Sequence, residues 1–201
     1  MVRVSTAVAV AVLLALVPAA RGAVVLNEVM ADPARDWSPT DGDDVYDSLD
    51  DEWVEIYNTG PGAVNVTGWR LTDASGDWRF GFQGTLPAGS HIVVYGNESY
   101  AWEDANGFPR SGLSLNNSGD TVTLVAADLV TVMDQVVYTA TQVLDDRAYG
   151  RLPDGGPEWQ VFDGLNPTSP PTKGIVPSPG AANQASPVEQ SSWGTIKALF
   201  E

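Results

Sequence analysis

The residues best suited to chemistry are carboxylates crowded between positions 32 and 51, where eight aspartates stand against one arginine. Calcium relieves the repulsion between neighbouring carboxylates, because it takes several oxygen ligands at about 2.3 to 2.6 Å in flexible geometry. The spacing does not match an EF-hand loop, and magnesium demands stricter octahedral geometry. A solvated acidic loop that only aids solubility is the alternative, and both interpretations stay open. The residues that would form the calcium loop are Asp36, Asp41, Asp43, Asp44 and Asp47.

The other groups that could do chemistry do not form a recognisable catalytic set. The chain has no cysteine and one histidine, His91, which follows a Gly-Ser turn and is expected at the surface or at a strand edge. A serine-based triad would need that histidine, and no Gly-x-Ser-x-Gly elbow is present. With 26 acidic residues, a carboxylate pair cannot be dismissed by counting alone. We expect no catalytic residue, and no cofactor other than calcium.

For two carboxylates and three tryptophans, the simplest interpretation is a structural role. Glu28 and Glu55 lie among apolar residues of predicted strands, where they would face solvent or pair with Arg70. An aromatic surface for sugars is one reading of the tryptophans, but core packing suits most of them better. These tryptophans are Trp53, Trp69 and Trp78.

The element that positions the acidic loop is the strand at residues 51–58. β-Branched and aromatic residues dominate it, and an Asn-Thr-Gly-Pro-Gly turn ends it. Val54 and Ile56 fall on one face, while Trp53 and Tyr57 fall on the other. Apolar bulk on both faces predicts a central strand rather than an edge strand.

Short strands with frequent turns account for the rest of residues 23–183. Alternation slips at Thr67-Gly68, which indicates a bulge or sharp bend. Residues 96–112 are predicted to form a loop, and no amphipathic helix is expected between 23 and 183. Eight or nine strands at this spacing predict an all-β fold, an antiparallel β-sandwich. The remaining strands are expected at 23–30, 64–71 with the slip inside it, 78–82, 91–95, 121–125, 130–139, 148–150 and 158–162.

Charge limits the partners of this 201-residue chain. Ten basic and 26 acidic residues give a formal net charge of −16. That charge repels nucleic-acid backbones and anionic membranes, so neither is expected as a partner. The length and the 43% hydrophobic content are enough for one domain with a real core.

The N-terminus has the pattern of a signal peptide. Arg3 precedes an apolar run from Ala7 to Val17, and Ala20-Arg21-Gly22 fits a small-x-small cleavage site. Eleven helical residues span about 16 Å, too short for a bilayer core of about 30 Å. We expect residues 1–22 to be removed, leaving no transmembrane segment and a secreted or cell-envelope protein.

The C-terminal part changes in composition. From Asn166 onward Pro, Ser, Thr, Gly and Ala predominate, which suggests a linker or an extended surface strap. The linker proper is expected at 184–190, before a short amphipathic tail at 191–201. This tail could fold back on the sandwich, dock on an export or anchoring partner, or be idle. Its apolar residues are Trp193, Ile196, Leu199 and Phe200.

The order and spacing of several short motifs resemble the lamin tail domain family over about residues 24–183. The resemblance implies an immunoglobulin-like sandwich without catalytic activity, of the kind found on exported, bacterial-type proteins. Residues 168–177 depart from the family pattern, where a tighter closing strand is expected. The matching motifs are Leu26-Asn27-Glu28-Val29, residues 52–58, residues 66–73, Leu86-Pro87-Ala88-Gly89, residues 114–120, Tyr149-Gly150-Arg151 and residues 179–183.

Together these features predict a non-catalytic binding or structural module that is secreted or held in the cell envelope. Its partner would be a protein or a glycan at the cell surface. Two other functions remain open: a surface or matrix component that assembles with copies of itself, and a small metal-dependent extracellular hydrolase that uses the acidic loop.

Overall fold

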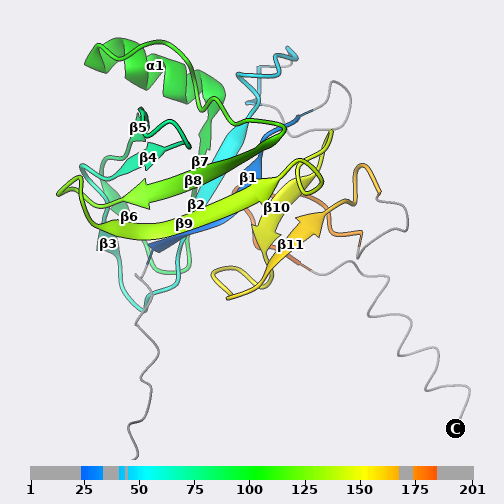
Figure 1. Ribbon diagram of the computed structural model, residues 1–201. Coiled ribbons are helices and arrows are strands. Elements are labelled where there is room, and N and C mark those ends of the chain that lie inside the picture. Colours follow the sequence, from blue (N-terminus) through cyan, green and yellow to red (C-terminus); the bar gives the residue numbers. More distant parts are fainter. Residues whose placement is uncertain (1–23, 34–40, 44, 168–173, 185–201) are drawn as a thin grey trace, which may run out of the picture.

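The computed structural model describes residues 24–33, 41–43, 45–167 and 174–184. In these residues the chain forms eleven strands and one helix (Figure 1). A five-stranded sheet has the order β11-β10-β1-β2-β7, a four-stranded sheet the order β5-β4-β8-β9, and β3 pairs with β6. The elements are β1 (Val24–Met30), β2 (Trp53–Asn58), β3 (Val64–Asn65), β4 (Arg70–Thr72), β5 (Trp78–Gly81), β6 (Thr85–Leu86), β7 (His91–Tyr95), α1 (Gly96–Asn106), β8 (Gly119–Val125), β9 (Val132–Thr139), β10 (Ala148–Arg151) and β11 (Trp159–Phe162).

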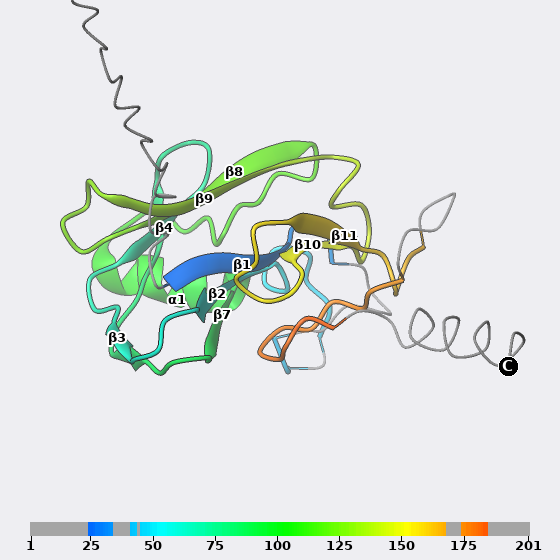
Figure 2. The ribbon, with the colours of Figure 1, turned by 90° about the horizontal axis from the view of Figure 1, so that it is seen from below.

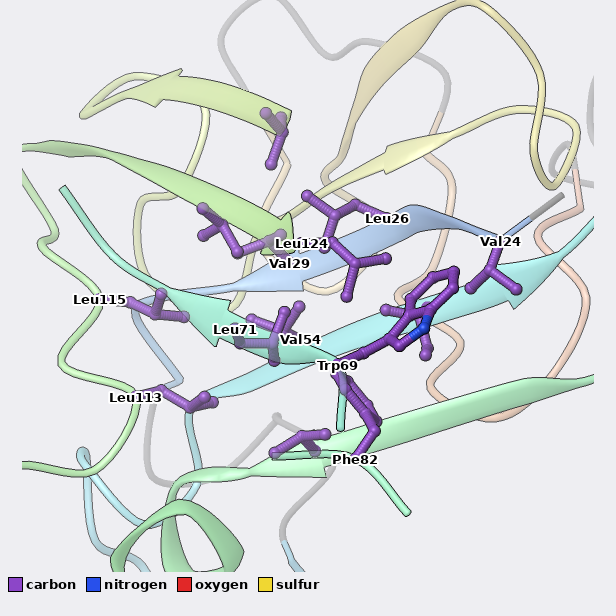
Figure 3. Close-up of a cluster of buried hydrophobic side chains, with 14 of the residues drawn as sticks. Val24, Leu26, Val29, Val54, Trp69, Leu71, Phe82, Leu113, Leu115 and Leu124 are labelled. Atoms are coloured by element: carbon purple, nitrogen blue, oxygen red, sulfur yellow. The ribbon is translucent and has the colours of Figure 1, made fainter. Parts of the chain in front are cut away.

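The two larger sheets face each other as a sandwich, and every strand pair in them is antiparallel (Figures 1 and 2). The predicted all-β, immunoglobulin-like antiparallel sandwich is confirmed. Its main core lies between the sheets, where side chains such as Leu26, Val54, Leu71 and Leu124 point toward one another (Figure 3). Full burial of such a side chain contributes about 1.5 to 3 kcal/mol, so this layer is the chief source of stability.

Strand β2 lies inside its sheet, between β1 and β7, as its two apolar faces predict. Val54 and Ile56 enter the core between the sheets. Trp53, on the opposite face, joins a second buried cluster with Met30, Ala148, Phe162 and Ile175. We call this second side the outer face of the five-stranded sheet, because it is turned away from the four-stranded sheet (Figure 2).

The predicted bend between β3 and β4 is confirmed at Gly68. This residue has a φ of +87°, which L side chains rarely adopt. A Cβ added there would also meet the Ala127 Cβ at 3.1 Å. The bend changes the alternation of the chain, so that Val66 and Trp69 are both buried in the main core.

The prediction of a loop at 96–112 without a helix was wrong, because α1 occupies its first part. The buried residues of α1 are Gly96, Ser99 and Glu103, which carry no apolar bulk. The Ser99 hydroxyl donates to the Arg79 carbonyl oxygen at 2.5 Å, and the Arg79 guanidinium lies 3.4 Å from the Glu103 carboxylate. Apart from Trp102, whose ring centroid is 6.3 Å from that of Phe80, α1 contacts β5 through polar side chains, so a search for hydrophobic periodicity does not find it.

The composition of the C-terminal part suggests either a linker or an extended surface strap. Residues 174–184 form an extended surface strap. It has no regular secondary structure and lies on the outer face (Figure 2). Ile175 is fully buried in the second cluster, and Asn183 is 5% exposed. We call residues 174–184 the strap. Of residues 168–177, where a tighter closing strand is expected, 174–177 form no strand and 168–173 lie outside the described residues.

Three predicted segments lie outside the described residues: the signal peptide at 1–22, most of the linker at 184–190, and the tail at 191–201. Among the residues that the structure describes, no helix has the length and apolar character needed to cross a membrane.

Candidate functional site

The described part of the acidic loop uses its carboxylates to shape its own backbone. The Asp41 carboxylate accepts the N–H of Asp43 at 3.1 Å, and the Asp43 carboxylate accepts the N–H of Val45 at 2.7 Å. Asp47 repeats the pattern with the N–H of Leu49 at 2.9 Å. These bonds are Asx turns, in which an aspartate receives a backbone N–H two residues ahead.

The acidic loop is also docked at the start of α1. The N–H of Gly96 donates to the Glu52 carbonyl oxygen at 2.9 Å, and the side-chain amide of Asn97 donates to Asp41. Gly96 is required here, because an added Cβ would lie 1.8 Å from the Leu49 carbonyl oxygen. The positive end of the helix dipole therefore faces carboxylates. Desolvation by burial still raises the pKa of Asp41 above its ordinary value.

Among the described residues, no group of three or more His, Cys, Asp or Glu side chains is arranged to hold a metal ion. Asp36 and Asp44, two of the five residues of the proposed calcium loop, lie outside the described residues. The structure brings Asp41 and Asp43 into one turn and places Asp47 beside them through Asp51, which accepts the N–H groups of Asp41 and Asp47. Calcium binding by this loop stays a prediction.

The single histidine is in an edge strand, as expected, but it is not a surface residue. His91 opens β7 at the edge of the five-stranded sheet, and its side chain is 11% exposed. Its Nε2 atom lies 3.1 Å from Asp154 Oδ2 and 4.0 Å from Glu55 Oε1. The imidazole ring packs on Tyr57, with the ring centroids 4.6 Å apart. His91 therefore faces two carboxyl groups on the outer face.

The expected exposure of Glu28 and Glu55, or their pairing with Arg70, was wrong. Both glutamates are fully buried, and they lie directly opposite each other on β1 and β2. Arg70 instead lies over the Trp102 ring, 5.1 Å from its centroid. A register shift between Leu26 and Glu28 marks a bulge in β1 at this point. Because such a bulge changes which way side chains point, simple alternation does not place Glu28 correctly.

Asparagine side chains connect the buried carboxyl groups. The amide of Asn27 donates to Glu55 Oε1 at 2.7 Å and to Asp154 Oδ1 at 3.1 Å. The oxygen of the same amide accepts the N–H of Gly155 at 2.9 Å. Asn27, Glu28, Glu55, His91 and Asp154 form what we call the carboxyl network.

The strap closes over the carboxyl network and supplies hydrogen-bond donors to it. Ser178 donates its N–H to Glu28 Oε1 at 3.3 Å, and Gly180 donates its N–H to Glu55 Oε2 at 2.7 Å. Asn183 donates its N–H to Asp154 Oδ1 at 3.0 Å and its side-chain amide to the Arg151 carbonyl oxygen at 2.9 Å. Each of the three carboxyl groups thus receives one strap N–H.

Burial dominates the electrostatics of the carboxyl network. Desolvation and the nearby charge of Glu55 raise the pKa of Glu28 well above its ordinary value. Desolvation also raises the pKa of Glu55, although hydrogen bonds from Asn27 and Gly180 oppose the shift. Glu28 Oε2 is buried and has no hydrogen-bond partner among the described residues. This arrangement favours a protonated carboxyl group.

The core assignment of the tryptophans is confirmed for Trp53 and Trp69, which are 0% and 8% exposed, whereas Trp78 is half-buried. A different aromatic group was missed because it lies in the segment predicted as a loop. Trp102 of α1 stacks on Phe108 at 5.1 Å between centroids, and the Arg70 guanidinium lies against the same ring system. Trp102 is therefore already engaged by side chains of its own chain.

Comparison with known proteins identifies the family. The model of the Lamin Tail Domain family matches residues 17–140, more than half of the chain. The match includes the acidic loop, α1 and the residues of the carboxyl network that precede β10, and it ends before the strap. A search of curated proteins finds no match. That family is a non-enzymatic one with an immunoglobulin-like fold. The chain belongs to the lamin tail domain family.

Proposed function

We propose that this chain is a non-catalytic binding module that works outside the cytoplasm, either secreted or held in the cell envelope. Support for export comes from residues 1–22, with Arg3, the apolar run from Ala7 to Val17 and the Ala20-Arg21-Gly22 pattern. The absence of cysteine means that the module would depend on its core rather than on disulfides in an oxidising compartment.

The observation that carries the non-catalytic part of the proposal is the engagement of His91. A general base must reach the proton that it removes from a substrate or nucleophile. Here the imidazole is 3.1 Å from the Asp154 carboxylate and only 11% exposed. The carboxyl groups beside it are covered by the strap. These groups are engaged within the fold, so recognition would depend on exposed faces of the sandwich.

The test of export is fractionation of cells that express the full-length chain, followed by N-terminal sequencing of the product. We expect the protein in the medium or the envelope, with Ala23 as its first residue. The matched control is a chain in which Met replaces residues 1–22, and this control should remain in the cytoplasm. A soluble cytoplasmic product that retains residues 1–22 would contradict the proposal.

Within this proposal, the tail at 191–201 is the segment that contacts an anchoring or sorting partner. Trp193, Ile196 and Phe200 have the i, i+3, i+7 spacing of one helical face, and such a face can dock in an apolar groove. Deleting residues 188–201 should then change the location of the protein while its melting temperature stays the same. Lost stability with unchanged location would instead indicate that the tail folds back on the sandwich.

A further inference from the structure

We propose that the carboxyl network is a proton-binding site, and that closure of the strap is coupled to a proton held on Glu28. The site lies on the outer face of the five-stranded sheet, between β1, β2, β7 and the loop at Asp154. The ligand of this site is a proton. Binding of the proton favours the closed position of residues 174–184. This inference stands apart from the question of export.

Three acids are brought together at this site, two of them fully buried. Glu28 and Glu55 are paired across neighbouring strands, and both are 0% exposed. Side chains directly opposite each other in antiparallel strands have Cβ atoms about 4.5 to 5.5 Å apart. Asp154 is linked to Glu55 through the Asn27 amide. Three carboxyl groups therefore share one covered site.

Compensating positive charge is scarce around these carboxyl groups in the described part of the chain. His91 is the one basic side chain within 4.0 Å of these carboxylates among the described residues. Arg151 is close in sequence to Asp154, but its guanidinium pairs with Asp134 at 2.8 Å and donates to the Leu26 carbonyl oxygen. The strap residues 174–184 contain no ionisable side chain. Among the described residues, three negative charges here would face one imidazole ring.

The oxygen atoms of Glu28 receive few hydrogen bonds from the described residues. Its Oε1 atom receives one N–H, from Ser178 at a long 3.3 Å, and its Oε2 atom is buried without a partner. Gly150 and Phe162 enclose the side chain, since a Cβ on Gly150 would lie 3.0 Å from Glu28 Cγ and 2.7 Å from the Phe162 ring. A buried charge with so few donors is costly, whereas a neutral carboxyl group suits this site. The raised pKa of Glu28 agrees with this geometry.

The direction of the pH effect follows from linkage. In the closed state the pKa of Glu28 is raised, whereas opening the strap would hydrate the carboxyl group and return its pKa toward the ordinary value. Closing therefore takes up a proton, and rising pH favours opening. At pH values below the ordinary pKa of a glutamate, Glu28 is protonated in both the open and the closed state. Strap closure then no longer depends on pH. Each pKa unit between the two states changes the closing equilibrium about tenfold.

The test is hydrogen exchange of the strap amides in the full chain from pH 5 to pH 8.5, corrected for the intrinsic exchange rate at each pH. We expect the protection of the Ser178 and Gly180 amides to fall at least tenfold as the pH rises. Glu28→Gln should weaken this dependence while it keeps an oxygen acceptor for Ser178, and the raised pKa of Glu55 leaves a smaller dependence of the same sign. The matched control is Glu158→Gln, an exposed glutamate near the same sheet, which should behave like the unaltered chain.

Two further measurements keep the proposal falsifiable if Glu28→Gln does not fold. Carboxyl-carbon NMR on the unaltered chain should show Glu28 titrating well above the ordinary value for glutamate. His91→Gln should keep the pH dependence of strap protection. Protection that is constant with pH, a Glu28 resonance that titrates in the ordinary range, or loss of the dependence in His91→Gln would each overturn the proposal.

Discussion

The backbone N–H of Gly180 donates a hydrogen bond of 2.7 Å to the carboxylate of Glu55, 125 positions earlier in the chain. Glu55 is in the middle of β2, and Gly180 is in a segment without regular secondary structure. The bond ties the C-terminal part of the described chain to a strand in the interior of the five-stranded sheet. The Glu55 carboxyl group thus has a structural partner in the strap rather than a catalytic role.

The Asn183 side chain fixes the end of the strap through two hydrogen bonds. It accepts a bond from the Ser178 hydroxyl at 2.6 Å and donates to the Arg151 carbonyl oxygen. Asn183→Ala leaves buried polar groups unpaired, so we expect a loss of about 1 to 3 kcal/mol in the free energy of unfolding. Urea denaturation measures it. Gln184→Ala, at the exposed neighbouring residue, should change stability by less than about 0.5 kcal/mol. Equal effects of the two substitutions would contradict the assigned role.

Trp69 gives the corresponding test for the main core. It is 8% exposed and packs with the apolar side chains between the two sheets (Figure 3). Trp69→Ala should cost about 3 to 5 kcal/mol, as large-to-small aromatic substitutions in cores do. Val130→Ala, at a residue that is 81% exposed, is the surface control. A loss below about 1 kcal/mol for Trp69→Ala would place this residue outside the core.

Glu52 predicts how stability varies with pH. It is 2% exposed, and burial is the main cause that raises its pKa to about 8. The folded state therefore keeps a proton that the unfolded chain has released between about pH 4.5 and pH 8, so stability falls as the pH rises through this window. Glu52→Gln keeps an acceptor for the Leu115 N–H. We expect its melting temperature to fall less between pH 5 and pH 9 than that of the unaltered chain. An identical slope would contradict the assignment.

Calcium binding by the acidic loop is tested by calorimetry and by melting curves with and without calcium. Binding to the native state alone stabilises it by about 2.7 kcal/mol when the free ion is at a hundred times its dissociation constant. We expect a calcium-dependent rise in melting temperature that disappears when Asp41, Asp43 and Asp44 are replaced together by Asn. No heat of binding at millimolar calcium would leave the solvated acidic loop as the correct interpretation.

Much of the sandwich could be predicted because its strands follow simple rules. In β2, apolar residues on both faces identify an interior strand, and at Gly68 a change of phase identifies the bend. Helix α1 could not be predicted in this way. Its buried residues are Gly96, Ser99 and Glu103, which form no apolar face for hydrophobic periodicity to detect.

The carboxyl network could be predicted only in part. Glu28, Glu55 and His91 stand out in the sequence, but their meeting depends on a bulge in β1 and on two asparagines from distant segments. The role of Asn27 and Asn183 in the network does not follow from local pattern, since their bonds to Glu55 and Arg151 join residues more than 25 positions apart. Long-range polar contacts of this kind become visible only in three dimensions.

The strap is part of the folding unit, although the family match ends at residue 140. The decisive measurement is the free energy of unfolding of a chain that ends at Gln184, compared with one that ends at Pro167. The shorter chain loses buried Ile175 and the strap donors to Glu28, Glu55 and Asp154. Loss of one large buried aliphatic side chain alone costs about 2 to 5 kcal/mol, so we expect a loss of at least that size. Stabilities that agree within about 0.5 kcal/mol, the range of ordinary surface changes, would contradict the account.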